Sequence, residues 1–285
     1  MELVDPVRRV IVVVLDGLRA DAIDRFELRT LMRLRGTAAW TTNGVTIDPS
    51  VTWAAMTSLM TGVPPELHGV VCDSIHLPRP RMKLDPLPGV LADAGLPTTA
   101  VLASVPRLFR AAAGAIGRRL GIGHLRFVGD GAEDILNSAR DRLAAQRRGL
   151  IFLHWPDADR AGHDHGWMSP AYEQAATTLD RALERLIDFV DLNRDQETLI
   201  IALADHGGGG VDPKDHMSEH PHDRTIPVFF TGAGVIPGEL GGRISLLDVP
   251  PTILWALGTE RPSSFTGAPV SRIFGTGRRV ASAVA

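Results

Sequence analysis

The sequence RVIVVVLDG, residues 9–17, sets an unbroken apolar run directly before an aspartate and a glycine. Such a run, rich in β-branched residues and without alternation, is typical of a strand covered on both faces, as in a parallel sheet. Ligands of open α/β sheets bind beyond the carboxyl ends of the strands. Asp16 therefore lies where a ligand is expected, although a strand-terminal aspartate also serves as a turn former or a helix cap.

Further apolar runs alternate with helix-like segments along the rest of the chain. This order predicts an α/β fold with a mostly parallel central sheet and helices on both faces. Ser169 and Pro170 are typical of the first residues of a helix. The expected strands after the first are Leu150–His154, Thr198–Ala204 and Pro227–Thr231. The expected helices are Ala132–Gln146, Pro170–Val190 and Leu247–Leu257.

The length, composition and net charge limit the domain number and the kinds of partner that the chain can have. A chain of 285 residues with 44% hydrophobic content can bury a large core. We expect one catalytic domain over residues 1–285, with a small irregular excursion around residues 74–126, where prolines and basic residues gather. A net charge of -3 gives no basic excess, so neither a nucleic-acid nor a membrane partner is expected.

Several features favour a cytoplasmic protein. The single cysteine, Cys72, excludes an internal disulfide and agrees with a reducing compartment. Met1–Arg9 has no apolar stretch before a cleavage site, so it does not resemble a signal peptide. The longest apolar run is far shorter than the roughly 20 residues that a membrane-spanning helix needs. The sequence does not indicate the oligomeric state.

Hydroxyl side chains gather in Pro49–Gly62, where they precede and line a short helix-like run. A hydroxyl at a helix N-terminus faces free N–H groups and the positive end of the helix dipole, which accommodate a phosphoryl group. The alternative is that these hydroxyls cap or pack the helix. The candidates are Ser50, Thr52, Thr57, Ser58 and Thr61.

Aspartate and histidine recur at the ends of the predicted strands. Asp159 and His163 are four residues apart, so one helical turn brings them onto the same face. Asp205 and His206 follow a strand and precede the glycines 207–210, which let the backbone approach an ion closely. A lone Asp–His pair is more often surface or turn chemistry, but several at successive strand ends indicate a metal site. Three more histidines follow: His216, His220 and His222.

In their order and spacing these motifs resemble the alkaline phosphatase superfamily. The resemblance spans nearly the whole chain and is strongest to the branch with nucleotide pyrophosphatases, type I phosphodiesterases and phosphonoacetate hydrolases. It implies the alkaline phosphatase-like fold. The motifs are VLDG at 14–17, Thr52 with the Thr-Gly pair at 61–62, DRAGH at 159–163, DHG at 205–207, His216, TIP at 225–227 and LLDVPPT at 246–252.

The resemblance also implies roles for individual residues around two divalent cations. It implies Thr52 as the nucleophile and a contact of the first cation, with Ser50 as the fallback. Among the ligands of the second cation, it favours His216 over His220 and Asp159 over Asp157. The ligands of the first cation are Asp16, Asp205 and His206. Those of the second are Asp159, His163 and His216.

One position departs from the phosphodiesterase branch. Where that branch places an asparagine that binds a phosphoryl oxygen, this chain has Asp73. An ionised aspartate cannot donate a hydrogen bond to phosphate and repels it. By its position in the family pattern, Asp73 is the candidate substrate-binding residue. Its charge weakens the assignment to the branch but not to the superfamily.

The resemblance implies a metal-dependent phosphohydrolase that cleaves phosphodiester, pyrophosphate or related small phosphoryl substrates through a phosphothreonine intermediate. Aspartate and histidine ligands without thiolates suit zinc and tolerate manganese. The alternatives are a phosphomonoesterase or phosphonate hydrolase on the same site, and a catalytically silent metal-binding module. A sulfatase would need cysteine or serine in place of Thr52, and a mutase usually carries a second sizeable domain.

Overall fold

The computed structural model describes residues 7–72, 80–104 and 107–275. Within them, one eight-stranded sheet has the order β4-β3-β5-β1-β6-β7-β2-β8. Most neighbouring strands are parallel, and β7 runs antiparallel to both β6 and β2. The strands are β1 (Arg9–Leu15), β2 (Ala39–Val45), β3 (Thr98–Leu102), β4 (His124–Phe127), β5 (Gly149–Trp155), β6 (Thr198–Leu203), β7 (Thr225–Gly232) and β8 (Gly238–Glu239).

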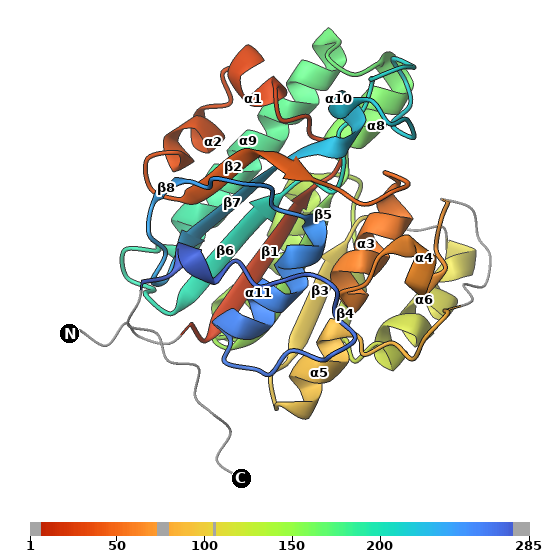
Figure 1. Cartoon of the computed structure of the whole chain (residues 1–285). Helices are drawn as coiled ribbons and strands as arrows, with labels where there is room; N and C mark the ends of the chain where they lie inside the picture. The colour runs from red at the N-terminus through yellow and green to blue at the C-terminus, as the bar shows by residue number, and fades with distance from the viewer. Residues whose placement is uncertain (1–6, 73–79, 105–106, 276–285) are drawn as a thin grey trace.

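Helices cover both faces of this sheet (Figure 1), as expected for the α/β class. On one face α9 packs against α7, α8 and α2, and on the other α11 packs against α3 and α5. The helices are α1 (Ala22–Arg25), α2 (Arg29–Leu34), α3 (Thr52–Thr61), α4 (Pro65–His68), α5 (Leu87–Asp93), α6 (Arg107–Arg119), α7 (Ala132–Ala145), α8 (Asp157–His165), α9 (Pro170–Val190), α10 (Pro221–Arg224) and α11 (Val249–Ala256).

The central strand β1 decides where functional side chains meet. It lies between β5 and β6, is parallel to both, and every one of its residues is buried. Leu15 pairs with Trp155 of β5, and Val14 pairs with Leu203 of β6. The carboxyl ends of these three strands therefore coincide at one edge of the sheet, which is where ligands of open α/β sheets bind.

The predicted long helix is confirmed as α9, from Pro170 to Val190, and the side chain of Ser169 accepts a hydrogen bond from the backbone N–H of Tyr172. Around residues 74–126, where an irregular excursion is expected, the described residues 80–86 form neither helix nor strand, whereas those that follow are largely regular. Helices α5 and α6 lie there, and β3 and β4 extend the sheet beyond β5. The prolines of the preceding segment do not continue into Thr98–Leu102, a short β-branched run that forms β3.

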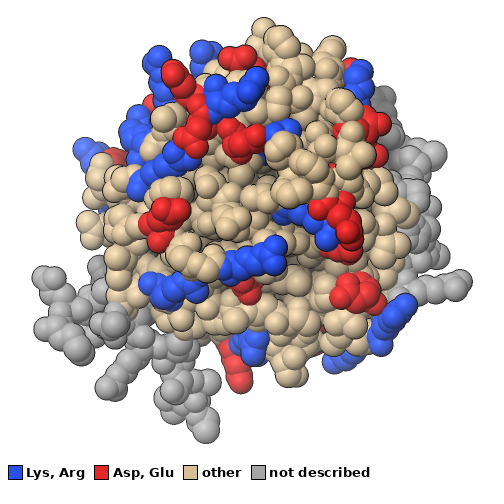
Figure 2. Space-filling view, turned by 45° about the horizontal axis from the view of Figure 1, so that its top comes forward, with Lys and Arg blue, Asp and Glu red and all other residues tan. Residues whose placement is uncertain are grey.

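The surface carries charges of both signs. Figure 2 shows acidic and basic side chains interspersed on the face that it presents, so this face offers no extended area of one charge. In the described part of the chain, no helix is both long enough and apolar enough to cross a membrane.

Candidate functional site

The site lies where the carboxyl ends of β1, β5 and β6 meet the start of α3. Asp16 follows β1, Asp205 and His206 follow β6, and α8 begins directly after β5. Four of the predicted ligands are almost fully buried: Asp16, Asp205, His206 and His216. Buried ionisable groups are costly unless they are paired or bind a metal, so this concentration of them indicates a functional site.

One cluster joins Asp16, Asp205 and His206, whose ligand atoms all lie within 4.8 Å of one another. His206 Nε2 is 3.4 Å from Asp16 Oδ1 and 3.6 Å from Asp205 Oδ2. Thr52 Oγ1 lies 3.1 Å from His206 Nε2 and 3.4 Å from Asp16 Oδ1. Among the described residues, no group hydrogen-bonds to the buried Asp205 Oδ2. The sequence-predicted nucleophile and first ligand set are therefore together.

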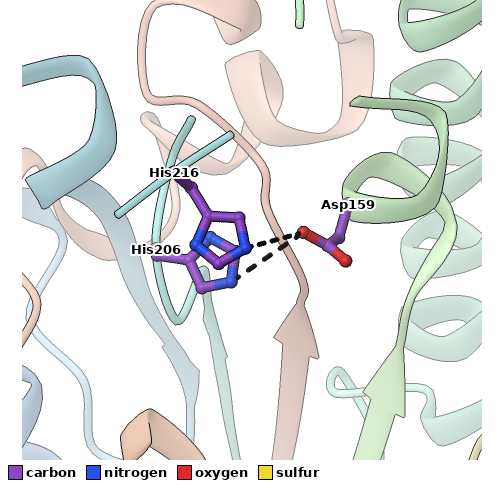
Figure 3. Close-up of side chains that lie close together, drawn as sticks. All are labelled: Asp159, His206 and His216. Atoms are coloured by element: carbon purple, nitrogen blue, oxygen red, sulfur yellow. Dashed lines mark ion pairs between the residues drawn. The ribbon is translucent and has the colours of Figure 1, made fainter. Parts of the chain in front are cut away.

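A second cluster joins Asp159, His206 and His216, again within 4.8 Å. Figure 3 shows the imidazoles of His206 and His216 stacked and facing the carboxylate of Asp159, and their ring centroids are 3.9 Å apart. Asp159 Oδ1 is 3.7 Å from His216 Nε2 and 3.4 Å from His163 Nε2. His163 lies at the more exposed side of this cluster, and its Nε2 is 3.1 Å from His216 Nε2. The predicted second ligand set is thus also brought together, and His206 stands between the two sets.

The three imidazoles share one hydrogen-bonding pattern. His206 Nδ1 is 2.8 Å from the carbonyl of Gly207, and His216 Nδ1 is 2.6 Å from that of Ser50. His163 Nδ1 is 2.9 Å from the carbonyl of Lys214. Because a carbonyl oxygen only accepts, each Nδ1–H donates, and Nε2 is the nitrogen left to bind a cation. This is how histidine is oriented around metal ions.

The electrostatics of the clusters also fit a cation. Burial disfavours the charged form of His206, but the carboxylates of Asp205, Asp16 and Asp159 outweigh it and raise its pKa to about 9. Burial, together with repulsion from Asp16, raises the pKa of Asp159 to about 7. Burial and the neighbouring His206 lower the pKa of His216 to about 3. Crowded carboxylates are stabilised by positive charge between them, and a bound cation would supply that charge in place of the proton on His206.

Gly17 allows these segments to approach one another. It has φ +69°, and a Cβ at this position would lie 2.7 Å from Asp159 Cα. The backbone N–H of Asp159 donates to the carbonyl of Asp16 at 3.0 Å. Trp167 Nε1 and the Tyr172 hydroxyl both donate to the Gly17 carbonyl, at 3.0 and 2.9 Å. The turn after β1 is therefore fixed against the start of α8.

The competing candidates from the sequence have other partners. Ser50 Oγ donates to the backbone carbonyl of His216, and Asp157 Oδ2 accepts from the N–H of Ala132 at the start of α7. His220 Nδ1 accepts from the N–H of His222 at 3.1 Å and caps α10. Neither Asp157 nor His220 belongs to either cluster found in the described residues. Asp73 lies outside the described residues.

Two further residues support the site: Asp223, which the sequence did not single out, and His154, which the sequence left outside both ligand sets. Asp223, which is buried, accepts from the N–H of Gly210 at 2.8 Å and from the N–H and hydroxyl of Ser218, so it organises the loop that carries His216. His154 contacts Asp16. His154 is the last residue of a predicted strand, and Asp16 directly follows another, so both lie at the same edge of the sheet. Asp223 does not directly follow a predicted strand, so its sequence context gives no such signal.

Comparison with known proteins shows the family of the chain. The model of the family described as type I phosphodiesterase / nucleotide pyrophosphatase matches residues 10–81 and 115–251. The chain belongs to this family. The resemblance to the alkaline phosphatase superfamily is thereby confirmed, and type I phosphodiesterase membership implies a divalent metal, for which the two clusters offer candidate ligands.

Among curated relatives, 2,3-bisphosphoglycerate-independent phosphoglycerate mutase from Enterobacter sp. (strain 638) is 30% identical over 123 residues. The match covers 42% of this phosphodiesterase-family chain and 23% of the mutase. GPI ethanolamine phosphate transferase 1 from Yarrowia lipolytica is 31% identical over 117 residues, which cover 38% of the chain and 12% of the transferase. The matches thus span a quarter or less of these two relatives.

Solved structures extend the similarity to almost the whole chain. An inactive variant of murine ectonucleotide pyrophosphatase/phosphodiesterase 5 in complex with AMP has a TM-score of 0.72 at 15% identity, covering 94% of this chain and all of that one. A mutant of alkaline phosphatase PafA has a TM-score of 0.69 at 12% identity, with coverage of 96% and 100%. At these identities the likeness shows the fold alone, and it confirms the alkaline phosphatase-like α/β architecture.

Proposed function

We propose that this chain is a two-metal phosphohydrolase that cleaves phosphodiester, pyrophosphate or related phosphoryl substrates, with Thr52 as the nucleophile. The observation that carries the proposal is the position of Thr52 Oγ1, 3.1 Å from His206 Nε2 and 3.4 Å from Asp16 Oδ1. Membership in the type I phosphodiesterase family and the alkaline phosphatase-like fold support the same class of reaction.

The two predicted ligand sets suit two divalent cations. Asp16, Asp205 and His206 would hold one of them beside Thr52, while Asp159, His163 and His216 would hold the other. Carboxylate oxygens and imidazole nitrogens without thiolates favour zinc and accept manganese. When bound, the cations supply positive charge that favours the Thr52 alkoxide and neutralises the phosphoryl oxygens.

Thr52 is well placed for attack because it is the first residue of α3. The N-terminus of a helix carries the positive end of the helix dipole, which favours a phosphoryl group bound at Thr52. Attack forms a bond from Thr52 Oγ1 to phosphorus and breaks the bond to the leaving group. Water then hydrolyses the phosphothreonine and restores the hydroxyl.

Substitution of the nucleophile tests the proposal. In the metal-loaded protein, Thr52→Ala should lower kcat/KM for bis(p-nitrophenyl) phosphate by about 10³-fold or more, because the attacking oxygen is lost. Two equivalents of bound metal should remain, and Thr52→Ser should retain measurable turnover as the matched control. Unchanged hydrolysis by the metal-loaded alanine variant would rule out Thr52 as the nucleophile.

A substrate panel separates the alternatives on the same site. Comparing a phosphodiester, a phosphomonoester and a phosphonate distinguishes a diesterase from a monoesterase or a phosphonate hydrolase. A protein that binds two equivalents of metal and turns over none of them would be a silent metal-binding module. Cytoplasmic location, a small-molecule substrate and a single catalytic domain remain predictions.

A further inference from the structure

His154 contacts Asp16 at the edge of the site. It is the penultimate residue of β5, and its Nε2 lies 2.7 Å from Asp16 Oδ2. Its side chain is 14% exposed. Neither metal-ligating cluster found in the described residues includes His154. The contact is therefore a feature of the site that the proposed ligand sets do not use.

The two oxygens of Asp16 have different surroundings. Oδ1 faces Thr52 Oγ1 and His206 Nε2, each at 3.4 Å, whereas Oδ2 is bonded to His154. A distance of 2.7 Å is at the short end for an N–H···O bond and is typical of a charged acceptor. Asp205 is held differently, because its Oδ1 accepts from the backbone N–H groups of Gly17 and His206, at 3.3 and 3.1 Å. The carboxylate of Asp205 is therefore held by backbone N–H groups, whereas that of Asp16 is held by the side chain of His154.

The strand register places the imidazole where it can reach Asp16. Val14 of β1 pairs with His154, and Asp16 follows Val14 by two residues. The backbone N–H of Asp16 donates to the Trp155 carbonyl at 3.0 Å, so the parallel pairing continues to the aspartate. Both β1 and β5 are paired with strands on each side, so the sheet fixes the backbone of His154 and of the residue before Asp16.

We infer that His154 is a positioning residue, which holds Oδ2 of Asp16 and leaves Oδ1 to face the cation shared with Thr52. This inference rests on the proposed function. Without His154, the carboxylate can rotate about χ2 and lose the orientation in which Oδ1 faces His206 and Thr52. Removal of the hydrogen-bonding partner of a metal ligand typically weakens metal affinity 10–100-fold.

The test measures metal binding, independently of turnover. Zinc dissociation constants for both sites are determined by chelator competition, and cobalt absorption spectra are recorded, for the wild type, His154→Ala and His154→Gln. His124→Ala is the matched control, since His124 lies on β4 and contacts Arg142. We expect His154→Ala to weaken zinc binding at the site of Asp16, Asp205 and His206 by about 10–100-fold and to alter the cobalt spectrum of that site. The affinity of the other site should not change. His154→Gln, whose amide N–H can donate to Asp16, should recover most of the affinity, and His124→Ala should match the wild type.

The outcomes separate the inference from the proposed function. If the wild type binds two zinc ions and His154→Ala binds both with unchanged affinity, the inference is wrong and the two-metal site stands. Equal weakening at both sites, without recovery in His154→Gln and with a lower Tm of the metal-free protein, would indicate a structural role and would also overturn it. A wild type that binds no metal would overturn the proposed function and the inference with it.

Discussion

Gly17 lies in close contact with the start of α8. A methyl group there would lie 2.7 Å from Asp159 Cα, and φ is +69°, a conformation that residues with a side chain rarely adopt. Gly17→Ala should therefore lower the free energy of unfolding by about 1–3 kcal/mol, measured by urea denaturation. Gly36→Ala is the control, because its Cβ would meet only the Arg33 carbonyl at 3.5 Å. Equal losses in the two variants would contradict the role given to Gly17.

His68 predicts a pH dependence away from the metal ligands. It is buried, its Nδ1 accepts from the Val70 N–H at 3.1 Å, and its Nε2 is 3.0 Å from Ser58 Oγ. Burial lowers the pKa of His68 to about 4, from 6.5. The unfolded chain therefore binds this proton first as the pH falls. The contribution of His68 to stability is complete above pH 6.5 and is lost progressively down to about pH 4, by about 3 kcal/mol.

The measurement for His68 is a difference between two proteins. The free energy of unfolding of the wild type and of His68→Gln is followed from pH 7.5 to 4 in denaturant, so that other titrating groups contribute equally to both. The wild type should lose more stability than the variant between pH 6.5 and 4. Parallel curves would show that His68 does not titrate as its burial implies.

Individual residues also show how far the site could be predicted from the sequence. Asp16, Asp205 and His206 could be singled out because polar groups directly follow apolar strands. The hydroxyl was ambiguous between Ser50 and Thr52, because nothing local reveals that Ser50 Oγ bonds to the His216 carbonyl, 166 residues away. Long-range contacts made by loops depend on the path of the loop, which periodicity does not encode.

At the scale of elements, strong local signals predicted structure and weak ones did not. The 21-residue helix α9 has an apolar stripe, a capping serine and a proline at its first position, and its bounds were predicted correctly. The strand β4 has four residues, which are too few for a clear period. The strand β2 contains Asn43 and Gly44 and an irregular register between Thr41 and Gly44, so it lacks the β-branched run of the central strands. The antiparallel direction of β7 could not be predicted, because its sequence is as apolar as that of the parallel strands.

Arg9 joins several elements at the edge of the sheet opposite the site. Its side chain is 2% exposed. It donates to the carbonyls of Leu143 and Gln146 at 2.6 and 3.0 Å, to Thr198 Oγ1 at 2.9 Å and to Asp195 Oδ2 at 2.6 Å. One guanidinium therefore links β1 to the end of α7, to β6 and to the segment after α9.

Arg9→Ala should lower the free energy of unfolding by about 2–4 kcal/mol, because it leaves the partly buried carboxylate of Asp195 and two carbonyls without their donor. The adjacent Arg8→Ala is the control. Arg8 pairs with Glu197, but its side chain is 62% exposed, so its loss should cost less than about 1 kcal/mol. The free energy of unfolding of both variants is measured by chemical denaturation. A similar decrease in the two would refute the linking role of Arg9.

At the scale of the whole molecule, the proposed ligands come from segments far apart in the chain. Residues 16, 159, 205 and 216 meet because β1 lies between β5 and β6, and the loop organised by Asp223 folds back over their ends. The three carboxylates Asp16, Asp159 and Asp205 are close enough to raise the pKa of His206 together. Correct strand order is thus a precondition for the site, and a bound cation would stabilise that order in return.

The most direct test of a two-metal site is a crystal structure of the zinc-loaded protein with anomalous scattering at the zinc edge. Two peaks are predicted, roughly 3.5–4 Å apart. One should lie roughly 2.0–2.2 Å from side-chain atoms of Asp16, Asp205 and His206, and the other at the same distance from Asp159, His163 and His216. A zinc-loaded crystal with no anomalous peak among these side chains, or with its zinc bound elsewhere, would contradict the assignment.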